Sequence, residues 1–143
     1  MRTKLLIMGT LATVVLFAGA CSAALGSPKQ AKVNVGYDEF MQDKHISKQV
    51  DVTTGSEIIV ELASNPSTGF TWTEATVGDP ALVKLVETNY VAPETGTVGA
   101  AGRQVWTFKA SGTGSTTVKM AYSRPWVGGE QSEWTFELTV NVE

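Results

Sequence analysis

The sequence predicts an all-β domain in which about eight short strands form a β-sandwich or a barrel. First, apolar and polar residues alternate with a period of two in several short runs, which is the pattern of half-buried strands. Second, clusters of Gly, Pro, Asn and Ser separate these runs and predict turns. Third, no convincing helical period occurs from Val33 onward. A chain of 143 residues suits a single domain with a real core.

The N-terminal segment has the pattern of an export signal. Arg2 and Lys4 precede an apolar run over residues 5–20, which is shorter than the roughly 20 residues of a membrane span. The run ends in Ala-Gly-Ala directly before Cys21, and this arrangement resembles the lipobox of bacterial lipoproteins. The resemblance implies a signal peptide over residues 1–20 and a lipid on Cys21. The protein would then be exported and held by this anchor at the cell surface or the periplasmic face of a membrane.

The alternative is an ordinary secretory signal that is cut near Ala20 or Ala23. In either case the small, polar residues that follow predict a flexible tether over residues 21–32. The folded domain is expected to span residues 33–143.

The strands of this domain are predicted from alternation and from the turn residues between them. The clearest strand places Trp134, Phe136, Leu138, Val140 and Val142 on one face and polar residues on the other. The residues after Asp79 are expected to open with one helical turn. The predicted strands cover residues 32–37, 46–52, 56–62, 70–75, 83–91, 103–110, 116–123 and 132–142.

The composition excludes several functional classes. The sequence pI of about 5.2 and the formal net charge of −3 argue against a nucleic-acid-binding protein. The chain has one Cys and one His, so it lacks a Cys/His nucleophile pair and any Cys/His metal spacing. His45 is expected to be an exposed surface residue. We therefore expect no enzymatic activity, no metal and no cofactor.

Three loops have an unusual composition. The first is Asn-Pro-Ser-Thr-Gly at residues 65–69, the second is the glycine-rich segment 94–104, and the third is the Arg-Pro-Trp segment 122–132. An even number of predicted strands separates each loop from the next. In an up-and-down or Greek-key sandwich the three loops would therefore lie at the same end, as binding loops do in antibody domains.

These residues carry a resemblance to a known family. Asn-Pro-Ser-Thr-Gly-Phe, a glycine-rich loop and Arg-Pro-Trp, in that order on an all-β chain, resemble the chagasin-type inhibitors of papain-like cysteine peptidases, family I42. The resemblance implies an immunoglobulin-like, Greek-key β-sandwich whose three loops enter the active-site cleft of the peptidase. Ser67 and Ala101 depart from the Thr and Gly that are usual in this family. The residues implied to contact the peptidase are Asn65, Pro66, Ser67, Thr68, Gly69, Phe70, Gly99, Ala100, Ala101, Gly102, Arg124, Pro125 and Trp126.

The residue types suit this task. Pro66 fixes φ and Gly69 permits a positive φ, so the first loop can hold a shape that is not that of a substrate. Trp126 and Arg124 are the residue types that most often dominate the energy of an interface. The alternatives are that the first loop is only a turn, that Trp126 is a buried cap, and that Arg124 pairs with Glu130. The other tryptophans are assigned to the core: Trp72, Trp106 and Trp134.

The leading hypothesis is a monomeric, reversible and non-covalent inhibitor of a papain-like cysteine peptidase. The alternative is a cell-surface, immunoglobulin-like module that uses the same loops to bind another protein or a glycan. A hydrolase on a sandwich scaffold is a third hypothesis, and the shortage of His and Cys counts against it.

Overall fold

The computed structural model describes residues 29–94 and 99–143. The predicted signal, Cys21 and most of the predicted tether lie outside the described residues, as does the 95–98 part of the glycine-rich loop. The described residues form nine β-strands, one short α-helix and one 3-10 turn, so the all-β prediction is confirmed. Within this part of the chain, no helix is long and apolar enough to cross a membrane.

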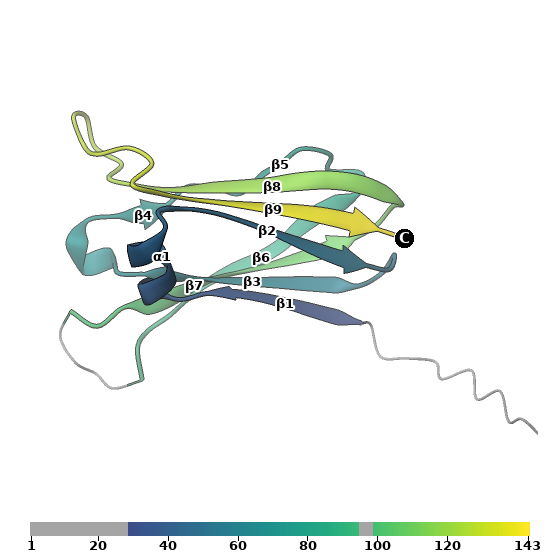
Figure 1. Ribbon diagram of the computed structural model, residues 1–143, viewed down its shortest axis with the longest axis horizontal. Helices are drawn as coiled ribbons and strands as arrows, with labels where there is room; N and C mark the ends of the chain where they lie inside the picture. The colour runs from purple at the N-terminus through teal and green to yellow at the C-terminus, as the bar shows by residue number, and fades with distance from the viewer. Residues whose placement is uncertain (1–28, 95–98) are drawn as a thin grey trace, which may run out of the picture.

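The strands form two sheets that face each other as the layers of a sandwich (Figure 1). In the first sheet the order is β1-β3-β7-β6, and in the second it is β2-β9-β8-β4, with β5 also paired to β8. The bounds are β1 Gln30–Val35, β2 His45–Val52, β3 Glu57–Ser64, β4 Thr71–Trp72, β5 Thr76–Val77, β6 Val83–Val91, β7 Gly102–Ala110, β8 Gly114–Ser123 and β9 Trp134–Val142.

The chain changes sheet between most consecutive strands. β6–β7 and β8–β9 are antiparallel hairpins, whereas β1 pairs with β3 and β2 with β9 in parallel, each after a connection that crosses to the other sheet. Both sheets are therefore mixed. Crossings of this kind, combined with two hairpins, give the immunoglobulin-like architecture that the resemblance implied.

Alternating residues of each strand build the core between the sheets. The predicted inward face of β9 is buried from Trp134 to Val142, and its outward residues are only partly buried. On the facing sheet, the buried side chains of β3 include Ile58, Val60 and Leu62. The period-two pattern therefore gave the inward face correctly, because only one side of each sheet meets the other.

Only the predicted strand 83–91 has the same bounds in the structure, and two of the differences have a clear physical reason. β1 begins at Gln30, so the last residues of the predicted tether pair with β3 instead. Of the predicted strand 70–75 only Thr71–Trp72 is a strand, β4, and β5 follows at Thr76–Val77, because the chain leaves the β8 ladder between them. At this point the Thr73 hydroxyl accepts the Ala121 N–H at 3.0 Å. The segment after Asp79 forms the single helical turn that was expected, with Leu82 N–H and Val83 N–H both donating to the Asp79 carbonyl, and it does not continue into a helix.

One helix was not predicted. α1 (Tyr37–Gln42) follows β1, and its single buried residue, Phe40, is fully enclosed. Six residues are too few to show a helical period, so the sequence pattern carried no signal for this helix.

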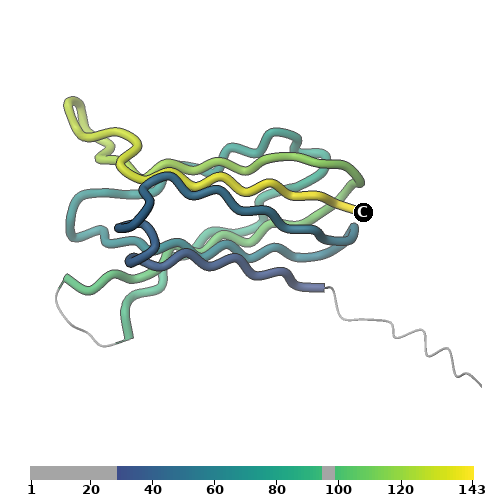
Figure 2. Tube along the Cα trace, in the orientation of Figure 1, coloured from purple at the N-terminus to yellow at the C-terminus, as the bar shows by residue number. Residues whose placement is uncertain are grey.

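Four connections lie at one end of the sandwich. Figure 1 shows α1, the loop that contains the 3-10 turn η1 (Pro66–Thr68), the described parts of the β6–β7 loop and the β8–β9 loop at this end. The trace in Figure 2 shows that the start of β1 and the C-terminus lie at the opposite end. The prediction that the three unusual loops share one end is therefore confirmed, and α1 joins them there.

Candidate functional site

The first loop is a rigid, self-bonded turn. Thr68 N–H and Thr68 Oγ1 both donate to the Asn65 carbonyl, at 3.1 and 2.7 Å, and Gly69 N–H donates to the Pro66 carbonyl at 3.0 Å. Gly69 closes the turn in the left-handed region, with φ of 81°, where a side chain would be strained. The side chains of Pro66, Ser67 and Thr68 are exposed at the tip. The loop therefore presents small polar groups on a backbone whose shape is already set.

Asn65 joins this loop to two other parts of the site. Its backbone N–H donates to the Tyr122 hydroxyl at 2.8 Å, which ties the loop to the end of β8. Its side-chain Nδ2 donates to the Gly99 carbonyl at 2.9 Å, which ties it to the glycine-rich loop. The residue thus fixes both the position of the first loop and its distance from the second.

The third loop exposes two apolar side chains. Gly129 N–H donates to the Trp126 carbonyl at 3.0 Å, and Gly128 takes φ of 78°, so a tight turn forms the tip. Trp126 is 53% exposed and Val127 is fully exposed. The alternative of a buried cap at Trp126 is therefore wrong, because half of the indole is open to solvent.

The Trp126 indole also packs on the first loop. A methyl carbon built on Gly69 would stand 2.4 Å from Trp126 Cη2, so the ring covers this glycine. The absence of a side chain at Gly69 thus serves two purposes, the left-handed backbone and the space that the indole occupies.

Arg124 connects the first and third loops from within. Its guanidinium lies 4.5 Å above the Phe70 ring and 5.8 Å from the Trp126 ring, both within cation–π range. Its Nη2 donates to the Thr68 carbonyl at 3.3 Å, and its Nη1 lies 3.3 Å from a Glu130 carboxylate oxygen. The pair with Glu130, which was the alternative to a peptidase contact, is therefore present, and Arg124 holds the first and third loops together.

A continuous stack of rings runs from α1 to the third loop. Phe40 stacks on Trp134 with centroids 4.8 Å apart, and Trp134 stacks on Tyr122 at the same distance. Tyr122 then stacks on Phe70 at 5.3 Å, and Arg124 covers the other side of Phe70. Stacked aromatic pairs contribute about 0.5–1.5 kcal/mol each beyond the area they bury. The loops therefore rest on a stiff aromatic support that begins inside the core.

The described residues of the glycine-rich loop differ in their exposure to solvent. Gly99 is exposed and takes φ of 85°, and among the described residues no atom outside its chain neighbours lies within 4 Å of a Cβ built on it. Ala100 and Ala101 are partly exposed. Gly102 is buried as the first residue of β7, where a Cβ would stand 2.4 Å from the Val91 carbonyl oxygen. Gly102 therefore supports the loop base, and Gly99 to Ala101 form the accessible part.

The sequence matches the model of the chagasin family of peptidase inhibitors, I42, over residues 51–140. The chain belongs to the chagasin family. The family is one of inhibitors and not of enzymes, in agreement with the sequence-based expectation. Chagasin of Trypanosoma cruzi is 29% identical over 99 residues, which are 66% of this chain and 88% of chagasin.

Two solved structures have a similar fold. The cysteine protease inhibitor EhICP2 of Entamoeba histolytica has a TM-score of 0.62 at 24% identity, over 82% of this chain and all of EhICP2. PbICP-C, which was solved in complex with falcipain-2, has a TM-score of 0.55 at 14% identity, over 80% of this chain and 99% of PbICP-C.

The predicted contact residues of this chagasin-family chain differ in exposure. The accessible ones at the loop end are Pro66, Ser67, Thr68, Gly99, Pro125 and Trp126. Phe70 and Gly102 are buried and act as supports. Sequence reasoning missed Val127 as an exposed apolar residue, although its place between Trp126 and two glycines was a usable signal. It also missed the role of Tyr122, because no sequence pattern reveals that its hydroxyl accepts the Asn65 N–H.

The described residues hold no group of three His, Cys, Asp or Glu side chains that could bind a metal ion. His45 is exposed at the start of β2, and its Nδ1 lies 2.8 Å from Thr135 Oγ1. Trp106 and Trp134 are buried as expected. Trp72 is partly buried, and its Nε1 donates to the Ala63 carbonyl at 3.0 Å.

Proposed function

We propose that this protein is a reversible, non-covalent inhibitor of papain-like cysteine peptidases whose loops occlude the active-site cleft. The proposal rests on the direct contacts that join the three loops. Asn65 bonds the first loop to Gly99 of the second, and Arg124 and Trp126 of the third loop pack on the first. The three loops together form one preformed surface at one end of the sandwich, which we call the wedge (Figure 1).

The wedge has the properties that an uncleaved inhibitor needs. Its leading segment is a 3-10 turn closed by a left-handed glycine, which is unlike the extended form of a substrate strand. The internal hydrogen bonds of Thr68 and the Arg124 contacts hold this shape before binding. Because little conformational entropy is then lost on docking, a preformed loop binds more tightly than a flexible one.

The names of the relatives support the same partner class. EhICP2 is described as a cysteine protease inhibitor, and PbICP-C was solved with falcipain-2 bound. The exposed Trp126 and Val127 supply the apolar anchors that dominate the energy of many interfaces. An interface of standard size would bury on the order of 1,600 Å² in total.

The test is a titration of the purified full-length protein into papain and a cathepsin-type enzyme, with a fluorogenic substrate. We expect one-to-one inhibition at nanomolar concentrations, with the inhibitor intact on a gel after prolonged incubation. A progressive loss of inhibition with cleavage in the 65–69 loop would show a substrate instead. No inhibition at micromolar concentrations would favour the alternative module, in which Trp126 and its neighbours bind another protein or a glycan.

The proposal extends to the location of the protein. We expect export through the signal at residues 1–20, a lipid on Cys21 and a monomeric domain that acts outside the cytoplasm. β1 begins at Gln30, at the end opposite the loops, so an anchor on this side would leave the wedge facing away from the membrane. Mass spectrometry of the membrane-extracted protein should find an acyl mass on Cys21, and Cys21→Ser should release the protein from the membrane. A soluble wild-type product cut near Ala23 would contradict the anchor and leave the inhibitor proposal intact.

A further inference from the structure

A hollow of about 400 Å³ lies beside the wedge, between α1 and the first and third loops. Its floor is the side of the ring stack, formed by Phe70, Tyr122 and Trp134. Asn65 and Thr68 form one wall. The hollow is therefore lined by the same residues that hold the first loop in place.

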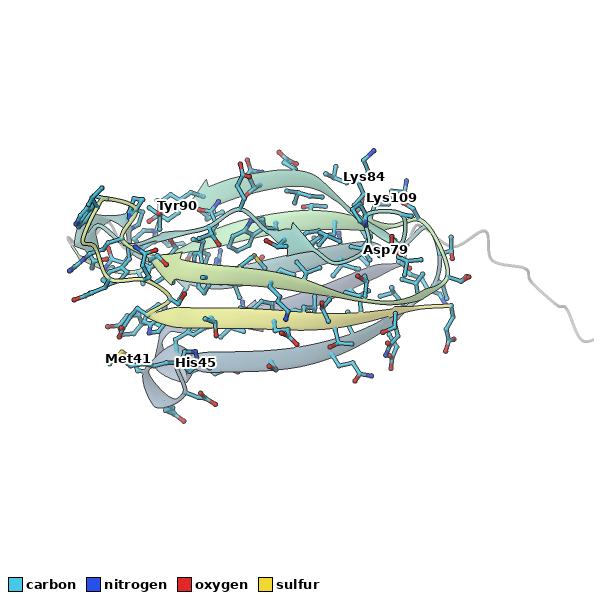
Figure 3. All side chains as sticks on the ribbon, turned by 90° about the horizontal axis from the view of Figure 1, so that it is seen from above. Met41, His45, Asp79, Lys84, Tyr90 and Lys109 are labelled. Atoms are coloured by element: carbon cyan, nitrogen blue, oxygen red, sulfur yellow. The ribbon has the colours of Figure 1, made fainter. Side chains whose placement is uncertain are left out.

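The opposite wall comes from α1. Phe40 anchors this helix in the core, where it is fully buried against Trp134. Tyr37 and Met41 are four residues apart and so share one face of the helix, and both line the hollow. They remain 46% and 60% exposed. Figure 3 shows Met41 at the loop end of the molecule, far from Lys84 and Lys109 at the other end.

The rim of the hollow carries balanced charge. Lys44 is paired with Glu133, and Arg124 is paired with Glu130. Each cation therefore has its anion beside it, and the hollow offers the edges of aromatic rings without a net charge. This chemistry suits an uncharged apolar side chain, which is desolvated at little cost, and disfavours a charged one.

The hollow is continuous with the proposed peptidase-binding wedge. Asn65, Thr68 and Arg124 belong to both, so an enzyme seated on the loops brings its surface over the hollow. A standard interface needs about 800 Å² on each partner, and the tips of three short loops are a small area by comparison. α1 precedes the residues matched to the family model, 51–140, so that match does not include it.

We propose that α1 and this hollow form a fourth contact region for the target peptidase. Tyr37 and Met41 contact the enzyme surface next to its cleft, and the hollow receives one apolar side chain from that surface. The inference rests on the proposed inhibitor function. This contact would make α1 a determinant of which peptidase is bound, because the loops fill the cleft and α1 contacts the enzyme surface beside the cleft.

The experiment compares inhibition constants and dissociation rates of the full-length protein and three variants against a panel of papain-like peptidases. Met41→Glu places a charge at the hollow, and Met41→Ser removes the apolar contact without adding charge. Val86→Glu is the matched control, because Val86 is 62% exposed on β6, near the end opposite the loops. Thermal unfolding of each variant confirms that it is folded.

We expect Met41→Glu to raise the inhibition constant by about tenfold or more against at least one enzyme of the panel, mainly through faster dissociation. Met41→Ser should show a smaller increase against the same enzyme, and Val86→Glu should stay within about twofold of the wild type. If the wild type inhibits and both Met41 variants match it against every enzyme, the fourth contact is overturned and the inhibitor function stands. If the wild type inhibits no enzyme of the panel, the proposed function fails and this inference fails with it.

Discussion

Gly69 lies beneath the indole of Trp126, so closely that an added methyl carbon would stand 2.4 Å from Cη2 of the ring. The two residues come from different loops and are far apart in the sequence. Their contact means that the shape of the first loop and the position of the most exposed indole are set together.

Gly69→Ala should therefore damage inhibition more than its backbone strain alone explains. The left-handed conformation costs an alanine about 1–2 kcal/mol of folding stability. The added methyl also pushes the indole away, so we expect a further loss of affinity for the peptidase. Gly55→Ala is the matched control, because Gly55 also has a positive φ and open space around it but lies between β2 and β3, at the end opposite the loops. Equal effects of the two variants on the inhibition constant would contradict a role for the Gly69–Trp126 contact.

Trp126→Ala should weaken inhibition with little effect on folding. An aromatic anchor at the centre of an interface contributes about 2 kcal/mol or more, which is roughly a thirtyfold change in the inhibition constant. Because half of the indole is already exposed, the free energy of unfolding should fall by less than about 1 kcal/mol. Inhibition assays and urea unfolding measure the two effects separately. Unchanged inhibition would remove Trp126 from the proposed interface.

Tyr122→Phe should loosen the first loop while the ring stack stays in place. The variant removes the hydroxyl that accepts the Asn65 N–H, so the folding free energy should fall by about 1 kcal/mol. Weaker inhibition should accompany this loss, because the loop is then less preorganised. Tyr90→Phe provides the control, since the Tyr90 hydroxyl makes no side-chain hydrogen bond to the described residues. A Tyr122 variant as stable and as inhibitory as the Tyr90 variant would show that the hydrogen bond is dispensable.

Phe40→Ala should be the most destabilising of these substitutions. The side chain is fully buried and stacks on Trp134, so its removal leaves a cavity under α1 and should cost about 3–5 kcal/mol. Met41→Ala on the same helix should change stability by less than about 0.5 kcal/mol, because Met41 is exposed. Denaturant unfolding of the two variants gives the comparison. A loss of less than 1 kcal/mol for Phe40→Ala would mean that α1 is not anchored by this ring.

Most strands could be predicted from the sequence because their alternation reflects burial on one face. In β9 every second residue from Trp134 onward is apolar and buried, and the pattern needs no tertiary information. The location of the loops at one end also followed, because strand direction reverses at each crossing. The break between β4 and β5 could not be predicted, because Thr is a common strand residue. Here the Thr73 hydroxyl, and not a backbone carbonyl, accepts the Ala121 N–H of β8.

The contacts within the site were less predictable. Pro66 and Gly69 revealed a turn, but the packing of Trp126 on Gly69 depends on how two distant loops meet. Arg124 could have faced a partner or its own loops, and only the structure shows that Phe70, Thr68 and Glu130 occupy its guanidinium. α1 was missed because one buried residue in six gives no period.

The uneven burial of the indoles gives the molecule a built-in optical reporter. Trp106 and Trp134 are enclosed, Trp72 is partly covered, and Trp126 is the indole that stands open at the tip of the wedge. A collisional quencher such as iodide therefore reaches mainly this ring in the free protein. Fluorescence that becomes resistant to iodide when a ligand is added will follow occupation of the third loop directly, without a label and without a substrate.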